Sequence, residues 1–482
     1  MSNFTVVDDF THIIAGAKAR SPTTVPVLNP ATAQPFTHVP LATHAQLNAA
    51  VAAAEAAFPG WAATPWSTRQ QALRSLADAL DSHRDAFAAL IAKEIGKDQG
   101  SAAFEVAISV PWLRTVAEQT LEDETVSKQP GKIATNRFRP YGVCAGIVPF
   151  NFPLTLTIII KFSQAILAGN CLIVKTPPTA PCVVAKFIEL AQSVLPPGVA
   201  SVLLGGDELG RWVVRHPRIL RVSFTGSTPA GKAVMAEAAT ELKALTLELG
   251  GNDPAIVLED VDPAEVAQTI AQGALHNAGQ TCFQIKRVYV HDAVYDAVKR
   301  ELVSLVQTML VGDPADPQVV VGPVQNEAQH ARLTDLLADC KAHGYKIAFK
   351  SEVPTDTKGY FIPVVIFDDP PEDSRIVREE QFGPFIPLMR WKDEEDVLRR
   401  ANGTEYGFGA SVWGRDMARC KRMADGLLNG MVWVNTWGAV GGDMPMGGVK
   451  HSGIGTENSK HGLTAWTYVQ SFVCVDPVGA KL

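Results

Sequence analysis

Cys282 is the first residue whose type and setting could do chemistry. It stands in ALHNAGQTCFQ (residues 274–284), among small and amide-bearing residues and three positions after Gly279. Many cysteines are simply small buried hydrophobes. The Gly279–Gln280 approach, however, suggests a tight turn that presents the thiol and its own N–H to one cavity. A nucleophile can use that shape, because thiol attack on a carbonyl creates an oxyanion beside the sulfur.

Two further loops carry groups that could assist such a thiol. Glu248 lies in LELGGN (247–252), and an apolar setting raises a carboxyl pKa toward the value that a general base needs. Asn151 lies in VPFNFP (148–153), between two prolines that stiffen the turn, so its amide could donate to an oxyanion. Taken singly, these residues also fit a carboxylate paired with an Arg and an ordinary turn asparagine.

Two loops could hold a phosphate and a ribose. In FTGSTPAG (224–231), Gly226 and Ser227 leave room for a phosphate at the start of a helix, although the stretch is not G-x-G-x-x-G. In EEQFGPF (379–385), the Glu380 carboxylate could hold ribose hydroxyls beside the Phe382 ring. The alternative interpretation of the second loop is a charged turn with a core Phe.

These loops follow short apolar runs that alternate with helical stretches from residue 142 onward, and a similar alternation runs from about 250 to 445. Such alternation predicts βαβ units and parallel sheets, that is, an α/β fold with two domains. Ligands of these sheets bind beyond the carboxyl ends of the strands, where the candidate residues stand. Upstream, the Ala-rich stretch from residue 44 predicts a helix that ends at Pro59–Gly60.

Composition excludes several classes of function. The chain has 482 residues, 46% hydrophobic and 19% charged, with a net charge of −7, which does not favour nucleic acid or an anionic membrane as a partner. Seven scattered cysteines, without a C-x-x-C pair, argue against a disulfide framework or a metal site and for a reducing cytoplasm. The N-terminus lacks the features of a signal peptide, and LTLTIII is too short to span a bilayer.

Together the loops resemble, in order, the signature segments of the aldehyde dehydrogenase superfamily. The matching segments are PFNFP, a strand ending at Lys175, FTGSTPAG, ELGG, GQTC, EEQFGP and PMGGVKHSG (445–453). Glu248 and Cys282 are 34 residues apart, the spacing expected of members that hydrolyse their intermediate rather than acylate CoA. The resemblance covers residues from about 20 to 475.

The resemblance implies a domain plan. Residues 1–124 and 141–247 would form a Rossmann-like dinucleotide-binding domain, and 248–445 a catalytic domain with the nucleophilic Cys. Residues 125–140 and 460–482 would form a small β segment for bridging and oligomerisation. The extended segments within it, 125–140 and 465–475, need strand partners, either each other or another subunit, which predicts a homodimer or homotetramer.

The resemblance also implies roles for individual residues. Cys282 would attack the aldehyde, Asn151 and the Cys282 N–H would hold the oxyanion, and Glu248 would activate water to release the acid. The residues expected at the cofactor are Ile147, Val148, Pro149, Phe150, Lys175, Gly226, Ser227, Leu249, Glu380 and Phe382. NAD is the first choice of cofactor and NADP stays open, because Pro178 stands where NAD-preferring members carry a Glu.

For the substrate pocket the sequence suggests Trp112, Phe152, His276, Phe283, Trp437 and Met446. This apolar and aromatic set favours an aliphatic or aromatic aldehyde, because burying an unpaired carboxylate is costly. Two enzyme alternatives stay open: a semialdehyde dehydrogenase that uses His276 or an Arg, and a CoA-acylating enzyme, against which Glu248 argues. An alternative of another class is a non-catalytic dinucleotide-binding or structural protein on the same fold.

Overall fold

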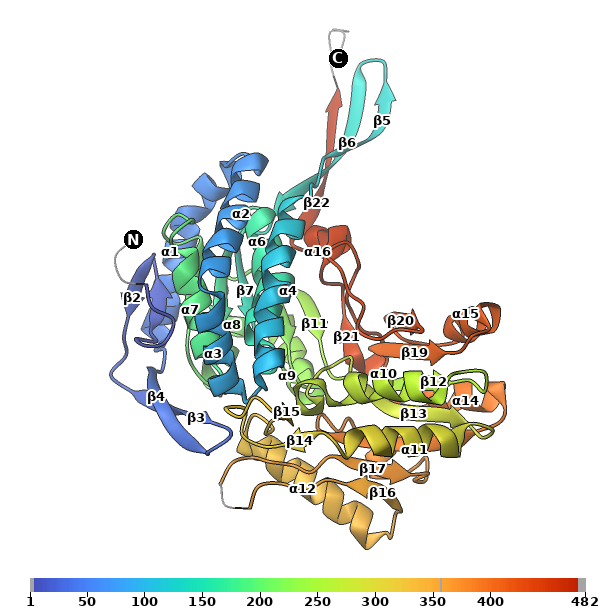
Figure 1. Ribbon diagram of the computed structural model, residues 1–482. Coiled ribbons are helices and arrows are strands. Elements are labelled where there is room, and N and C mark those ends of the chain that lie inside the picture. The colour runs from blue at the N-terminus through green and yellow to red at the C-terminus, as the bar shows by residue number, and fades with distance from the viewer. Residues whose placement is uncertain (1–3, 356–357, 476–482) are drawn as a thin grey trace.

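Two mainly parallel β-sheets, each covered by helices, and a smaller antiparallel sheet make up the computed structural model, which describes residues 4–355 and 358–475 (Figure 1). The N-terminal half builds most of the first sheet, and the segment between residues 253 and 434 builds the second. The antiparallel sheet projects from the body as an arm. The predicted α/β fold class is confirmed.

The first sheet has the strand order β2-β1-β9-β8-β7-β10-β11-β21, and its five strands from β9 to β11 are parallel. Its strands are β1 (His12–Ile14), β2 (Ala17–Ala19), β7 (Val143–Ile147), β8 (Cys171–Lys175), β9 (Ala200–Leu203), β10 (Arg221–Thr225), β11 (Ala244–Glu248) and β21 (Gly453–Ile454). Strands β7 to β10 are buried along their whole length, which explains their continuous apolar runs. The edge strands β2 and β21, and β1 beside β2, have two or three residues, too few for a sequence pattern to indicate them.

Ten helical segments between residues 44 and 239 cover this sheet, some in direct contact with it and some packed on other helices. They are α1 (His44–Ala63), α2 (Trp66–Ser82), α3 (Arg84–Ile95), α4 (Gln99–Ala117), α5 (Pro153–Thr157), the π-helix η1 (Ile158–Phe162), α6 (Ser163–Leu167), α7 (Cys182–Ala191), α8 (Asp207–Arg215) and α9 (Thr228–Ala239). The prediction that the first helix ends at Pro59 was wrong, because α1 continues for another turn. Trp61, 4% exposed, anchors that turn by donating its indole N–H to the Ile166 carbonyl at 3.1 Å.

The second sheet has the order β16-β17-β18-β13-β12-β19-β20, and all its neighbours are parallel except the β16–β17 pair. Its strands are β12 (Asp253–Val257), β13 (Ile285–His291), β16 (Ile347–Lys350), β17 (Val365–Asp368), β18 (Phe385–Trp391), β19 (Gly409–Trp413) and β20 (Met431–Val434). The helices between them are α10 (Pro263–Leu275), the 3₁₀-helix η2 (His276–Gly279), α11 (Tyr295–Val306), α12 (Glu327–Ala342), α13 (Arg375–Arg378), α14 (Glu394–Ala401) and α15 (Met417–Asp425).

The arm consists of β5 (Glu124–Gln129), β6 (Lys132–Pro140) and β22 (Thr467–Val475), in the order β22-β6-β5. The two extended segments predicted from the sequence thus pair with each other within the chain, from Thr467 opposite Pro140 to Val475 opposite Lys132. The remaining elements are the hairpin β3 (Thr24–Asn29) with β4 (Gln34–Pro40), the pair β14 (Leu310–Val311) and β15 (Val319–Val321), η3 (Lys450–Ser452) and α16 (Ser459–Ala465).

The domain boundaries given by the resemblance stay a prediction, and residues 1–3 and 476–482 of those ranges lie outside the described part of the chain. Two details bear on the site. Glu248 is the last residue of β11, so it belongs to the first sheet, and residues 453–454 return to that sheet as the partner of β11. Across the described residues, no helix combines the length and the apolar character that a bilayer crossing requires.

Candidate active site

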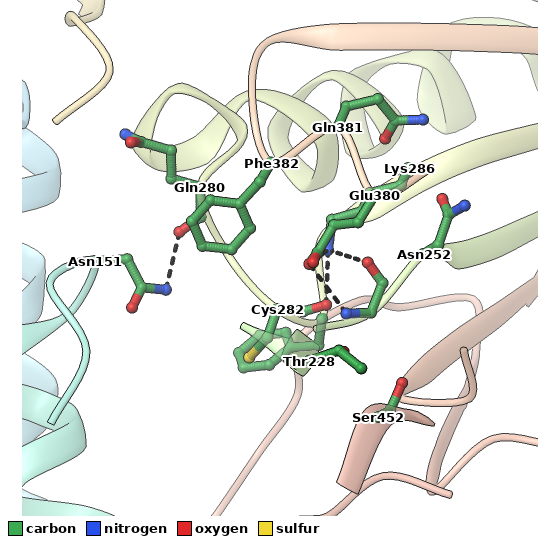
Figure 2. A network of polar contacts seen from close by, with 12 residues as sticks. Asn151, Thr228, Asn252, Gln280, Cys282, Lys286, Glu380, Gln381, Phe382 and Ser452 are labelled. Atoms are coloured by element: carbon green, nitrogen blue, oxygen red, sulfur yellow. Dashed lines mark hydrogen bonds and ion pairs between the residues drawn. The ribbon is translucent and has the colours of Figure 1, made fainter. Parts of the chain in front are cut away.

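A strained turn presents Cys282. Asn277 and Ala278 have positive φ values of 52° and 53°, and Gly279 follows at 77°. A Cβ on Gly279 would lie 2.1 Å from the Gly383 carbonyl oxygen, so only glycine fits between η2 and the loop before β18. The Gln280 carbonyl accepts a hydrogen bond from the Asn151 side chain at 3.0 Å (Figure 2). It accepts a second one, at 3.3 Å, from the side chain of Asn277 in the same turn.

Glu248 lies against the thiol. Cys282 Sγ donates to Glu248 Oε1 at 3.5 Å, and Thr225 donates to the other carboxyl oxygen at 3.1 Å. Both residues are almost fully buried, and burial is the main cause that raises the pKa of the Glu248 carboxyl and the pKa of the Cys282 thiol. The carboxyl end of β11 therefore holds a base of raised pKa next to a protonated sulfur.

A buried ion pair that sequence reasoning did not identify stands behind Glu248. Lys161, in the π-helix, donates to Ser223 Oγ at 2.5 Å and to Glu457 Oε1 at 3.2 Å. Its charge lowers the pKa of Glu248 and the charge of Glu457 raises it, both less strongly than burial does. In the sequence, Lys161 only interrupts an apolar run, and Glu457 follows the PMGGVKHSG segment without a role that its position indicates.

Asn151 comes from the loop after β7, two residues before Pro153 starts α5. Its Nδ2 donates one hydrogen bond to the Gln280 carbonyl at 3.0 Å, and an amide nitrogen has a second donor to offer. The backbone N–H of Cys282 has no acceptor within residues 4–355 and 358–475. Two donors near the sulfur are thus available to a ligand oxygen.

A second buried ion pair supports this loop. Lys97 Nζ donates to Glu105 Oε2 at 2.5 Å, and Glu105 Oε1 accepts from the N–H groups of Leu154 and Thr155 at 3.0 and 3.2 Å. The Lys97 ammonium also lies 3.4 Å from the centre of the Phe152 ring. Glu105 therefore satisfies the free N–H groups at the start of α5, and Lys97 supports a wall of the cavity beyond it.

That cavity has a volume of about 640 Å³ and opens beside Cys282. All six residues suggested for the substrate pocket line it together with Cys282 and Asn151. Sequence reasoning missed the other residues that line the cavity, several of them on α4. They are Asp98, Gly100, Ser101, Phe104, Ile108, Thr155, Leu156, Ile159, Gln272, Thr281, Gly438 and Val440.

Hydrogen bonds fix two of the cavity's indole rings. The Trp112 N–H donates to Asn458 Oδ1 at 3.1 Å, and the Trp437 N–H donates to the Phe283 carbonyl at 2.7 Å. His276 stacks on Phe152 with ring centres 5.8 Å apart, and burial, helped by the Lys97 charge, lowers the pKa of His276 to about 4. At neutral pH this imidazole is uncharged, so it adds no positive charge to the cavity.

None of the residues expected at the cofactor is among those that line the cavity. Ile147 and Lys175 end the adjacent strands β7 and β8, and Val148, Pro149 and Phe150 continue toward Asn151. Gly226 and Ser227 precede α9, where the Ser227 side chain caps the helix, and Leu249 follows Glu248. The rings of Phe150 and Phe382 meet edge to face, 6.1 Å apart.

Two charged residues of this set have side-chain atoms without a partner in the part of the chain that the structure describes. Lys175 is 4% exposed, and its ammonium has no hydrogen-bond or ion-pair partner in the described chain; burial lowers the pKa of Lys175 to about 8. Glu380 Oε1 accepts from Gly251 N and Lys286 Nζ, both at 3.0 Å, whereas Oε2 accepts from no described residue (Figure 2). Lys175 stands at the carboxyl end of β8, as predicted, but the same expectation was wrong for Glu380 and Cys282, which precede β18 and β13 and so stand at the amino ends of strands. A buried cation without a partner and a half-used carboxylate still fit the phosphates and ribose hydroxyls of a dinucleotide.

A metal site has no comparable support, because no three His, Cys, Asp or Glu side chains gather as a metal site in the part of the chain that the structure describes.

A model of the aldehyde dehydrogenase family matches residues 17–472. The chain belongs to this family. An aldehyde dehydrogenase from a Fusarium species is 35% identical over 462 residues, which cover 95% of this chain and 98% of that protein. The phenylacetaldehyde dehydrogenase of Pseudomonas fluorescens is 34% identical, with 94% and 93% covered.

The fold agrees with this assignment. The solved structure of an aldehyde dehydrogenase from Bacillus cereus in complex with NAD⁺ superposes with a TM-score of 0.94 at 31% identity, and 97% of each chain is covered. The resemblance found in the sequence is therefore confirmed, and with it the prediction that the chain is an NAD(P)-dependent aldehyde dehydrogenase.

Proposed function

We propose that this aldehyde dehydrogenase oxidises an apolar aliphatic or aromatic aldehyde to its carboxylic acid, with Cys282 as nucleophile, Glu248 as base and Asn151 as oxyanion donor. One observation carries the proposal: the thiol contacts the Glu248 carboxyl group and lines the same aromatic cavity as the Asn151 amide, although the three residues come from distant loops.

The first half of the reaction uses the contact between thiol and carboxylate. Glu248 takes the S–H proton at the 3.5 Å contact, and the sulfur bonds to the aldehyde carbon. The carbonyl electrons move to the oxygen, where the second Asn151 donor and the Cys282 N–H stabilise the charge. A bound NAD or NADP would supply a hydride acceptor, so that loss of hydride from the carbon re-forms the C=O bond and leaves a thioester on Cys282.

The second half is hydrolysis. Once the Glu248 proton has passed to solvent, the carboxylate beside the sulfur can take a proton from water as the water oxygen attacks the thioester carbon. The C–S bond breaks, the acid leaves, and the sulfur regains a proton. This use of Glu248 favours water over CoA as the acceptor of the acyl group. The contact with the thiol adds a role in the first half that sequence reasoning did not assign to Glu248.

The cavity supports an apolar substrate. Neither Lys nor Arg is among its lining residues, its one acid is Asp98, and His276 is neutral. A carboxylate-bearing aldehyde would enter without an ion partner, which is costly in a buried site. The semialdehyde alternative is therefore the less favoured one. The Pseudomonas fluorescens relative is named for phenylacetaldehyde, an aldehyde of the favoured kind.

The choice of cofactor follows from Lys175. Its unpaired ammonium suits a ribose hydroxyl of NAD, and the cofactor of the Bacillus cereus relative supports NAD as the first choice. Pro178 brings no carboxylate to repel a 2′-phosphate, so NADP stays the second candidate.

The arm supports a homodimer or homotetramer. Strands β5 and β22 are the edges of its sheet, and they expose apolar side chains, which are Val126, Tyr468, Val469, Val473 and Val475. Exposed apolar edge strands need a partner. Light scattering on the purified chain tests this, and a monomer would contradict it. A cytoplasmic location remains a prediction from the scattered cysteines.

A panel of aldehydes and cofactors tests the function. Hexanal, benzaldehyde and succinic semialdehyde are each assayed with NAD and with NADP, by absorbance of the reduced cofactor. We expect a higher kcat/KM for hexanal or benzaldehyde than for succinic semialdehyde. Preference for the semialdehyde would overturn the substrate assignment, a strict need for CoA would overturn hydrolysis, and dinucleotide binding without turnover of any aldehyde would favour a binding protein.

A further inference from the structure

Lys286 is a buried cation whose hydrogen bonds join three loops of the active site. It is the second residue of β13, and its side chain is 3% exposed. Its Nζ donates to the Cys282 carbonyl at 2.8 Å, to the Gly251 carbonyl at 2.7 Å and to Glu380 Oε1 at 3.0 Å (Figure 2). An ammonium has three donors, so the whole capacity of this side chain serves the site.

The loops can approach Lys286 this closely because two glycines follow β11. A Cβ on Gly251 would lie 2.3 Å from the Cys282 carbonyl oxygen, and a Cβ on Gly250 would lie 2.3 Å from Glu380 Oε2. Gly251 N also donates to the Glu380 oxygen that Lys286 holds, at 3.0 Å. The loop behind the base, the loop of the nucleophile and the loop of Glu380 are thus packed around one ammonium.

Lys286 is also the cation that balances the acids around the thiol. Burial raises the pKa of Cys282 most, and the charges of Glu248, Asp253 and Glu380 raise it further, whereas the charge of Lys286 lowers it. Asp253 shows the same balance, since burial raises the pKa of its carboxyl and Lys286 opposes that shift. Lys286 is thus the cation that opposes the effect of these three carboxyl groups on the pKa of Cys282.

We propose that Lys286 is a positioning residue for the reaction: it ties the backbone of the nucleophile to Gly251 and holds Glu380 so that Oε2 stays free for a ribose hydroxyl. Lys286 acts through Cys282 and Glu380 and does not itself meet the aldehyde. The inference rests on the proposed function, because it takes Cys282 as the nucleophile and Glu380 as a cofactor ligand.

The first test measures the thiol without substrate or cofactor. Wild type and Lys286→Met are alkylated with iodoacetamide over a series of pH values, and peptide mass spectrometry follows Cys282 alone. Loss of a nearby cation should raise the apparent pKa of Cys282 by about one unit and slow alkylation about tenfold at a fixed pH. The matched control is Lys186→Met, which removes another buried lysine, paired with Glu189 at 2.9 Å on α7, and should keep the wild-type profile.

The second test measures the affinity for NAD, which depends on the proposed contact between Lys286 and Glu380. Calorimetric titration with NAD should give a dissociation constant about tenfold higher for Lys286→Met than for wild type, because Glu380 loses its anchor. Lys286→Arg keeps the charge and should keep the alkylation profile close to wild type. If the Met variant does not fold, Lys286→Gln carries the same two predictions, because it keeps donors but lacks the charge.

An unchanged alkylation profile together with an unchanged affinity for NAD, in a folded variant, would overturn the role of Lys286. Failure of the proposed function looks different. In that case alkylation of Cys282 in the wild type would leave aldehyde oxidation intact, whatever the Lys286 variants do.

Discussion

The two binding regions proposed beside Cys282 differ in the groups that they offer a ligand. In the region proposed for the cofactor, Lys175 ends a strand and Glu380 lies in a loop. The Lys175 ammonium and one Glu380 carboxylate oxygen have no hydrogen-bond partner among the described residues. On the substrate side, a cavity of about 640 Å³ is walled by aromatic and aliphatic side chains and contributes no cation. The contrast suggests that a few exact contacts bind one reactant, whereas size and apolar character select the other.

The largest effect on activity is expected when the Cys282 sulfur is removed. Cys282→Ala should lower kcat by about 10⁴-fold or more, because no other group forms the covalent intermediate. Dinucleotide affinity should change little, since the cofactor contacts are untouched. Cys340→Ala, which removes another buried thiol, is the control and should stay active. Residual turnover near the wild-type rate in Cys282→Ala would contradict the assignment.

The proposed role of Glu248 as the base predicts how the activity depends on pH. Burial raises the pKa of its carboxyl above the ordinary value of 4.5, and only the ionised form acts as a base. Activity should therefore fall as the pH falls through that raised pKa. Glu248→Gln should lower steady-state kcat by about 100-fold or more and abolish this acid limb. Stopped-flow absorbance should still detect a burst of reduced cofactor, slower than in wild type; an unchanged pH profile would exclude the role.

Asn151 is the proposed oxyanion donor, and its loop also carries residues expected at the cofactor and in the cavity. Asn151→Ala should lower kcat by about 100- to 1000-fold, the usual loss when one oxyanion donor is removed. The affinity for the dinucleotide, measured by titration, should stay near wild type. A change confined to KM for the aldehyde would mean that Asn151 only shapes the cavity.

The smallest expected effect concerns the cofactor side alone. Lys175→Met should raise KM for NAD by about tenfold and KM for NADP by more, because a 2′-phosphate loses an ion partner rather than a hydrogen bond. Lys186→Met, at a buried lysine that already has a partner, should leave both constants unchanged. An equal increase in KM for NAD and for NADP would mean that Lys175 does not contact the 2′-phosphate.

The sequence marks loops more readily than it marks the wall of the cavity, for a physical reason. Loops such as FTGSTPAG and EEQFGP lie at the ends of strands, so a local pattern marks each of them. Cavity residues such as Phe104 and Ile108 lie on α4, far along the chain from Cys282, and only the folded structure brings them together. A helical apolar pattern cannot tell a cavity wall from a core.

The buried ion pairs were also beyond sequence reasoning. Lys97, Lys161 and Lys286 are buried, yet nothing in the sequence distinguishes them from ordinary surface lysines. Their partners Glu105, Glu457 and Glu380 are 8, 296 and 94 residues away, and only the close spacing of Lys97 and Glu105 is local. Tertiary packing likewise carries α1 through Pro59, against its propensity.

The most direct measurement traps the covalent intermediate. Glu248→Gln enzyme is mixed with benzaldehyde and NAD, quenched in acid at the end of the burst, digested and analysed by mass spectrometry. We predict that the peptide carrying Cys282 gains a benzoyl group as a thioester, and that the same sample of Cys282→Ala, Glu248→Gln does not. Reduced cofactor formed without an acyl group on Cys282, or with the acyl group on another residue, would contradict the account.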